Sequence, residues 1–95
     1  KDRIAVEAKS LTVERPLTHS ILTVHMKQAK RRLLPTVTRD VYRGVLLVYS
    51  SGALANCRKE LGSLHRSNPR IRISEIDGLE QALEELKRSI ARLGK

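Results

Sequence analysis

Apolar and polar residues alternate near the start of the sequence and predict an amphipathic strand over residues 4–9. A period of two places Ile4, Val6 and Ala8 on one face, which we expect to be the core face. Glu7 and Lys9 then share the opposite face. This strand therefore presents a carboxylate and an amine side by side.

A helix is predicted between Pro16 and Pro35, over residues 17–34. Its apolar positions follow the spacing of a buried helix stripe and are Leu22, Met26, Ala29 and Leu33. Basic residues gather near its C-terminal end, where the helix dipole favours cations. Several β-branched residues in its first half are poor helix formers, so a strand over residues 20–26 stays open as an alternative.

The next apolar run, residues 45–49, is continuous and predicts a strand buried on both faces. We expect this strand to form the centre of the sheet. A second amphipathic helix is predicted over residues 53–65, followed by a break at Pro69. Its apolar positions are Leu54, Cys57, Leu61 and Leu64.

The last third of the chain predicts a short strand and a helix. Ile71 and Ile73 alternate with polar residues, which puts Arg72 on an exposed face. Asp77 is the expected N-cap of the helix, and Glu80 is its capping-box partner. The expected core stripe of this helix is Leu79, Leu83, Leu86, Ile90 and Leu93.

The resulting order is strand, helix, strand, helix, strand, helix, with helices long enough to cross over between parallel strands. This order predicts an α/β layered domain. A chain of 95 residues has room for one such domain with one modest core.

The net charge of the chain indicates the class of binding partner. The chain holds 19 Lys and Arg against 10 Asp and Glu, a net charge of +9, which favours a polyanion. No apolar run approaches the ~20 residues of a membrane span, so no membrane partner is expected. Tyr42 and Tyr49 are the only aromatic residues, which argues against base stacking and for phosphate contacts. A single cysteine, Cys57, fits a cytoplasmic protein.

The densest basic region covers the end of the first helix and the loop after it. We interpret it as a surface for the phosphate backbone of nucleic acid, with a solvated helix end as the alternative. Its cations are Lys27, Lys30, Arg31, Arg32, Arg39 and Arg43.

The triplet Glu7-Ala8-Lys9 is the arrangement that points to chemistry. Strand geometry places the Glu7 and Lys9 backbones about 7 Å apart on one face. A carboxylate can hold Mg²⁺, the metal polarises a phosphate and activates water, and a lysine orients the nucleophile or offsets developing charge. The backbone carbonyl of Ala8 is a further candidate ligand. A solvated pair of charges is the alternative reading of this face.

These segments resemble the PD-(D/E)xK nuclease superfamily, which has the restriction-endonuclease-like fold. Its signature includes an apolar strand ending in Glu-x-Lys, then a helix, then a buried strand, and residues 4–9, 17–34 and 45–49 match that order. Residues 43–52 are similar to the glycine, apolar strand and small polar turn of Mrr-type restriction endonuclease domains. Residues 73–79 are similar to their late strand, Ile-Asp-Gly turn and helix start. The resemblance covers most of the chain from Arg3 onward.

The resemblance implies a central mixed sheet flanked by helices and a Mg²⁺-dependent DNA endonuclease, with Mn²⁺ as a substitute metal. Glu7 would be the metal ligand and Lys9 the catalytic lysine, with Gln28 on the following helix beside the site. It also implies DNA as partner and, as an open option, a homodimer or a larger nuclease assembly.

The family also uses an acidic residue, usually Asp, at the start of the preceding strand. Asp2 is the only acid before Glu7 and belongs to the same strand or its entry turn. We therefore expect that acid upstream of Lys1, with residues 1–95 as the C-terminal core of the nuclease domain. Two alternatives stay open: a non-catalytic basic α/β module that binds nucleic acid, such as a ribonucleoprotein component, and a degenerate nuclease fold used for assembly.

Overall fold

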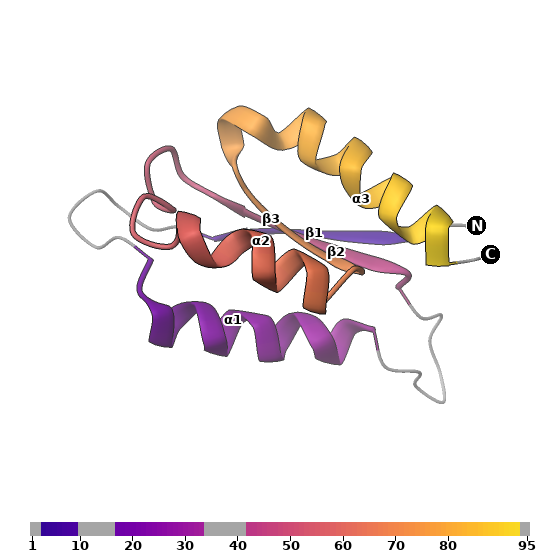
Figure 1. Ribbon diagram of the computed structural model, residues 1–95, viewed down its shortest axis with the longest axis horizontal. Helices are drawn as coiled ribbons and strands as arrows, with labels where there is room; N and C mark the ends of the chain where they lie inside the picture. The colour runs from indigo at the N-terminus through magenta and orange to yellow at the C-terminus, as the bar shows by residue number, and fades with distance from the viewer. Residues whose placement is uncertain (1–2, 10–16, 34–41, 94–95) are drawn as a thin grey trace.

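A three-stranded parallel sheet forms the middle of the protein in a computed structural model that describes residues 3–9, 17–33 and 42–93. Strands β1 (Ile4–Lys9), β2 (Gly44–Tyr49) and β3 (Ile71–Glu75) are paired in the order β1-β2-β3. Helices α1 (His19–Arg32) and α2 (Arg58–Ser67) lie on one side of the sheet, and α3 (Leu79–Leu93) lies on the other (Figure 1). The α/β class is confirmed.

The central strand β2 is buried over its whole length. Its side chains alternate between two cores, because β2 has helices on both faces. Val45, Leu47 and Tyr49 pack towards α1 and α2, while Leu46 and Val48 pack with α3. The sequence prediction of a central strand buried on both faces is therefore confirmed.

The three described strands are all parallel, so they do not form the mixed sheet that we expected. The helical connections explain this geometry. In the described part of the chain, α1 lies between β1 and β2, and α2 lies between β2 and β3, which lets each following strand run in the same direction.

Helix α1 confirms the predicted helix, and the alternative strand over residues 20–26 is wrong. The Thr18 hydroxyl accepts a hydrogen bond from the Ile21 backbone amide at 3.2 Å and caps the first turn. Leu22, Met26 and Ala29 form the buried stripe. Tertiary burial of that stripe outweighs the low helix propensity of the β-branched residues.

The predicted core face of β1 was wrong. Glu7 pairs in register with Leu47, and Lys9 with Tyr49, so both charged side chains lie on the face that α1 covers. On the other face Val6 is 55% exposed, because α3 packs on β2 and β3 rather than along β1. The side chains of Glu7 and Lys9 are thus more buried than Val6, although the sequence pattern assigned Val6 to the core face.

Two helix starts also differ from the prediction. Leu54 and Cys57 are buried, but they lie in turns ahead of α2. Asp77 lies in a 3-10 turn, Ile76–Gly78, and its carboxylate accepts a hydrogen bond from the Ser51 hydroxyl instead of acting as the N-cap of α3. In α3 the fully buried residues are Ala82, Leu86 and Ile90, whereas the expected core residue Leu93 is 44% exposed.

Candidate active site

Strand β1 and helix α1 bring three of the predicted site residues together. Lys9 Nζ lies 4.0 Å from Glu7 Oε2 and donates a hydrogen bond to Gln28 Oε1 at 3.3 Å. The side chains of Glu7 and Lys9 are 16% and 23% exposed. The amine is therefore held between a strand carboxylate and a helix amide, in a half-sheltered position.

The two oxygens of the Glu7 carboxylate differ in their partners. Oε1 accepts a hydrogen bond from Arg32 Nε at 3.0 Å, which anchors the last turn of α1 to β1. Oε2 is buried and has no hydrogen-bond partner in the part of the chain that the structure describes. An unpaired buried carboxylate oxygen is costly, so a native structure that keeps one usually uses it for a ligand, an ion or water.

A second pair of side chains lies next to these residues. His25 Nδ1 and the Tyr49 hydroxyl are 2.7 Å apart, and the two rings stack with 5.7 Å between centroids. Burial and then the Lys9 charge lower the pKa of His25, although Glu7 opposes them. Burial also raises the pKa of Tyr49, helped by Cys57 and Glu7. Both rings are therefore neutral near pH 7; the charges of Lys9 and Glu7 both act on the pKa of His25, and that of Glu7 acts on the pKa of Tyr49.

A hollow opens beside Lys9 at the carboxyl ends of β1 and β2. It has a volume of about 330 Å³ and is lined in part by Ala8, Ser50, Ser51 and Ile76. The carboxyl ends of parallel strands are where open α/β sheets commonly bind ligands. The hollow gives a phosphate-sized group access to the end of β1.

The side chains at this site determine how a divalent metal ion would be held. Glu7 Oε2 is a hard oxygen of the kind that Mg²⁺ prefers, and among the described residues nothing donates a hydrogen bond to it. Such ions often take one or two carboxylates and complete their shell with water and substrate phosphate. Within residues 3–9, 17–33 and 42–93, no three His, Cys, Asp or Glu side chains cluster as metal ligands. Glu7 thus fits as one ligand of a shell completed mostly by water and phosphate.

Ala8, which the sequence suggested as a carbonyl ligand, lies on β1 in register with Val48, with its side chain on the face opposite to Glu7. The role of its carbonyl stays a prediction.

The basic residues of the predicted DNA surface divide over two sides of α1. Lys27 and Lys30 line a groove between α1 and α2, together with His19. Arg31 is exposed, while Arg32 lies on the other side against Glu7. Arg43 precedes β2 and donates its backbone amide to the Arg3 carbonyl. Arg39 lies outside the described residues.

Sequence reasoning placed Arg32 among the phosphate contacts and gave no role to the His25–Tyr49 pair. Helical spacing carried a usable signal. His25, Gln28 and Arg32 stand at i, i+3 and i+7, which is a single stripe of α1. Once Glu7 and Lys9 are placed on the face that α1 covers, this stripe is the one that meets them.

Comparison with protein-family models, with curated proteins and with solved structures found no match. No helix within the described ranges is both long enough and apolar enough to pass through a bilayer. The functional assignment of this protein therefore depends on the geometry of the β1–α1 site.

Proposed function

We propose that this protein is a Mg²⁺-dependent DNA endonuclease domain of the restriction or DNA-processing type. One observation carries the proposal: Glu7 Oε2 is buried without a hydrogen-bond partner among the described residues, 4.0 Å from Lys9 Nζ, on a sheet face covered by α1. A carboxylate oxygen and an ammonium group at this separation suit the hydrolysis of a phosphodiester. The restriction-endonuclease-like fold and the resemblance to Mrr-type domains belong to the same proposal.

Each side chain then has a defined task. Arg32 holds Glu7 Oε1, so that Oε2 stays directed to a metal ion. Gln28 holds Lys9 through its amide oxygen and limits the positions that the ammonium group can take. Lys9 orients the attacking water or offsets charge that builds on the phosphate. A bound Mg²⁺, or Mn²⁺ in its place, would polarise the phosphate and lower the pKa of water.

DNA would be held by phosphate contacts outside this centre. Lys27, Lys30 and Arg31 are exposed on α1 and have no ion-pair partner among the described side chains. Free cations of this kind release counterions when they meet phosphates. A homodimer or larger nuclease assembly would present one such centre to each strand of a duplex.

A non-catalytic DNA-binding module is the second candidate, and the Arg32–Glu7 ion pair favours it. A guanidinium 3.0 Å from the carboxylate offsets the charge that a metal would need. In that function Glu7 would serve only to pin α1 to β1, and the basic residues of α1 would bind nucleic acid without cutting it.

Plasmid nicking separates the two functions. We expect wild-type protein to nick supercoiled DNA with Mg²⁺ and to lose this activity with EDTA, with Glu7→Gln, and with Lys9→Met. Glu80→Gln provides the matched control, because Glu80 is exposed in the first turn of α3, on the side of the sheet opposite to α1 (Figure 1). Circular dichroism would show that each variant is folded.

The contrary result is equally specific. If wild-type protein shifts DNA in a gel but never cuts it, and if Glu7→Gln and Lys9→Met bind DNA like wild type, the nuclease function is wrong. The binding module then describes the protein.

A further inference from the structure

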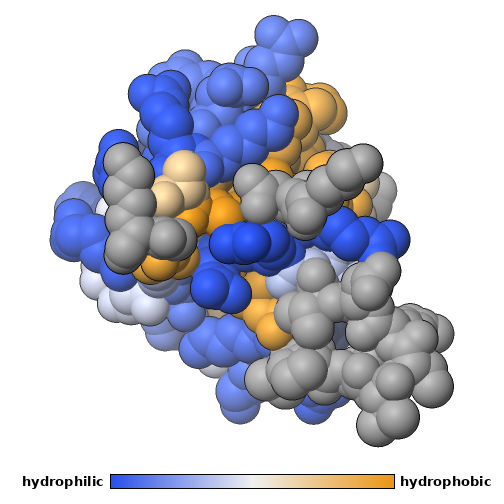
Figure 2. All heavy atoms as spheres, turned by 90° about the vertical axis from the view of Figure 1, so that its right-hand side faces the viewer, coloured by the Kyte–Doolittle hydropathy of each residue, from blue (hydrophilic) through white to orange (hydrophobic). Residues whose placement is uncertain are grey.

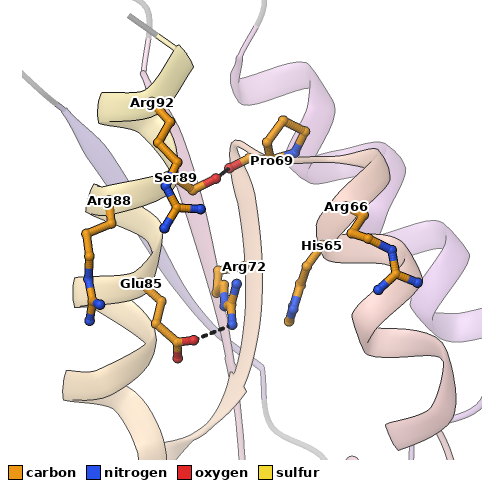
Figure 3. A pocket seen from close by; sticks show the side chains of 8 residues that line it. All are labelled: His65, Arg66, Pro69, Arg72, Glu85, Arg88, Ser89 and Arg92. Atoms are coloured by element: carbon orange, nitrogen blue, oxygen red, sulfur yellow. Dashed lines mark hydrogen bonds and ion pairs between the residues drawn. The ribbon is translucent and has the colours of Figure 1, made fainter. Parts of the chain in front are cut away.

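A second pocket lies at the opposite edge of the sheet, along β3. It has a volume of about 320 Å³ and lies between the C-terminal halves of α2 and α3 (Figure 3). Its floor includes Arg72 of β3, and His65 and Arg66 come from α2. The lining residues from α3 are Glu85, Arg88, Ser89 and Arg92.

Cations dominate this pocket. Four arginines line it, against the single carboxylate of Glu85. That carboxylate is already engaged, because Arg72 Nη2 donates to Glu85 Oε2 at 2.8 Å. No ion-pair partner for Arg66, Arg88 or Arg92 exists among the residues that the structure describes. Three guanidinium groups around the pocket are thus not neutralised by a described carboxylate. Figure 3 shows Arg92 close to Ser89, whereas Arg66 and Arg88 lie along the outer sides of α2 and α3 and would turn inward to reach a ligand.

The position of the pocket explains how the fold tolerates this charge. All three helices end on the same side of the molecule, and basic residues occupy their last turns. Helix C-termini carry partial negative charge, which stabilises nearby cations. Figure 2 shows that the described residues on this side are largely hydrophilic, with smaller apolar areas near the centre and at the upper right.

Hydrogen bonds within the walls hold the pocket open in a defined shape. His65 Nε2 accepts the Ile73 backbone amide at 3.1 Å, and Ser89 Oγ donates to the Pro69 carbonyl at 2.7 Å. In this arrangement His65 is neutral and its other ring nitrogen carries a proton. The pocket therefore offers hydrogen-bond donors to a ligand, while the acceptor nitrogen of His65 is already bonded to the Ile73 amide.

The residues that line the pocket indicate which class of ligand it binds. Guanidinium groups bind phosphate oxygens with paired, charge-assisted hydrogen bonds, and Arg is the preferred residue for such sites. The volume is at the lower end of the range for small-molecule pockets. The described lining includes no Phe, Tyr or Trp, the large aromatic side chains on which a nucleobase commonly stacks. The recognised part is the anion itself.

The concave shape favours a small ligand over a DNA backbone. Helix walls on two sides enclose an anion, whereas duplex phosphates lie along a convex rod and suit cations spread over an open surface. We propose that the α2–α3 pocket binds a small ligand through its polyphosphate group. This site is formed by β3, α2 and α3 and is independent of the proposed nuclease centre on β1 and α1.

Calorimetric titration with inorganic pyrophosphate at low ionic strength, without metal, tests the proposal. We expect saturable binding with one site per chain. Arg88→Gln and Arg92→Gln should each weaken binding about tenfold or more, the cost of a charged hydrogen bond. Lys59→Gln is the control, because it also removes one positive charge, from the exposed first turn of α2 outside the pocket, and should bind like wild type.

A gain of affinity provides a second measurement, because a misfolded variant would lose affinity. Glu85→Gln removes the one negative charge of the pocket and releases Arg72 from its ion pair. We expect this variant to bind pyrophosphate more tightly than wild type.

Three results would overturn the proposal. The first is an absence of saturable binding by the folded wild-type protein. The second is an equal loss in Lys59→Gln and in the pocket variants, which would indicate attraction by net charge alone. The third is loss of duplex DNA binding in Arg88→Gln and Arg92→Gln without any pyrophosphate binding, which would make the occupant a nucleic-acid backbone.

Discussion

Arg32, in the last turn of α1, binds Glu7 on β1 through a hydrogen bond of 3.0 Å between Nε and Oε1. The pair joins two elements that the sequence separates by 25 positions. It also decides which carboxylate oxygen stays open. The proposed metal ligand and the packing of α1 on the sheet are therefore linked through one side chain.

This link can be measured as a coupling energy. Arg32 is 49% exposed, so solvent screens the pair, and we expect a double-mutant cycle of Glu7→Gln and Arg32→Gln to give about 0.5 kcal/mol. Urea unfolding of the four proteins supplies the values. A coupling energy of zero would mean that the two side chains do not interact in solution.

The pKa of His25 reports on the same site without any DNA. Burial lowers this pKa first, the Lys9 charge lowers it further, and Glu7 raises it. Lys9→Met should therefore raise the pKa of His25, and Glu7→Gln should lower it. NMR titration of the imidazole checks both shifts, with Lys59→Met on the exposed surface of α2 as the control. Shifts of the opposite sign would contradict the placement of His25 beside Lys9 and Glu7.

Glycine is required where α3 approaches β2. A Cβ atom at Gly44 would lie 2.6 Å from Ile90 Cδ1 and 3.3 Å from the Arg70 carbonyl oxygen. We expect Gly44→Ala to lower the free energy of unfolding by about 1–3 kcal/mol through overpacking. Gly62→Ala is the matched control: its nearest neighbour is an arginine side chain at 3.6 Å, and alanine favours the helix there. Denaturant unfolding should show loss in the first variant and none in the second.

The stability of the fold should depend on pH through His65. Burial, then the Arg72 charge, lower the pKa of His65 from 6.5 to about 4, while Glu85 opposes them. The folded state thus binds a proton less readily than the unfolded chain. The contribution of neutral His65 is complete above pH 6.5 and is lost as the pH falls towards 4.

Comparison with a variant isolates this contribution from the carboxylates that titrate nearby. His65→Gln keeps an acceptor for the Ile73 amide but cannot titrate. Its free energy of unfolding should fall less than that of wild type between pH 6.5 and 4. Identical pH profiles for the two proteins would show that His65 titrates in the same way folded and unfolded.

Salt dependence tests the proposed DNA surface on α1. If Lys27, Lys30 and Arg31 each meet one phosphate, replacing one of them with Gln should reduce the slope of log affinity against log salt by about 0.9. Gel-shift titrations at several salt concentrations give this slope. Lys59→Gln, on α2, should leave this slope unchanged. Equal slopes for wild type and all three α1 variants would place the phosphate contacts elsewhere.

Much of the architecture could be predicted from periodicity. The apolar run of β2 and the stripe of Leu22, Met26 and Ala29 on α1 are strong signals, because burial on both faces or on one helix face leaves a direct pattern. The face of β1 could not be predicted in this way. Val6 would face a core only if α3 extended over β1, and that depends on where a helix that begins at Leu79 packs.

The candidate site was predictable to a similar extent. The spacing of Glu7 and Lys9 placed both on one face, and the structure keeps them there. Which oxygen of Glu7 is free depends on the rotamer of Arg32 and on the docking angle of α1. Neither quantity leaves a trace in residue order, so the ion pair that divides the two oxygens became apparent only in three dimensions.

The hydrogen bond from the Ile73 amide to His65 has a consequence for self-association. Among the described strands β3 is an edge strand, and its outward amides are a template on which a strand of another molecule can pair. The His65 imidazole accepts a hydrogen bond from one of these amides, so that amide is not available to another strand. We therefore expect His65 to hinder the pairing of β3 with a strand of another molecule. Protonation of His65 in acid would break its hydrogen bond to the Ile73 amide and remove this hindrance.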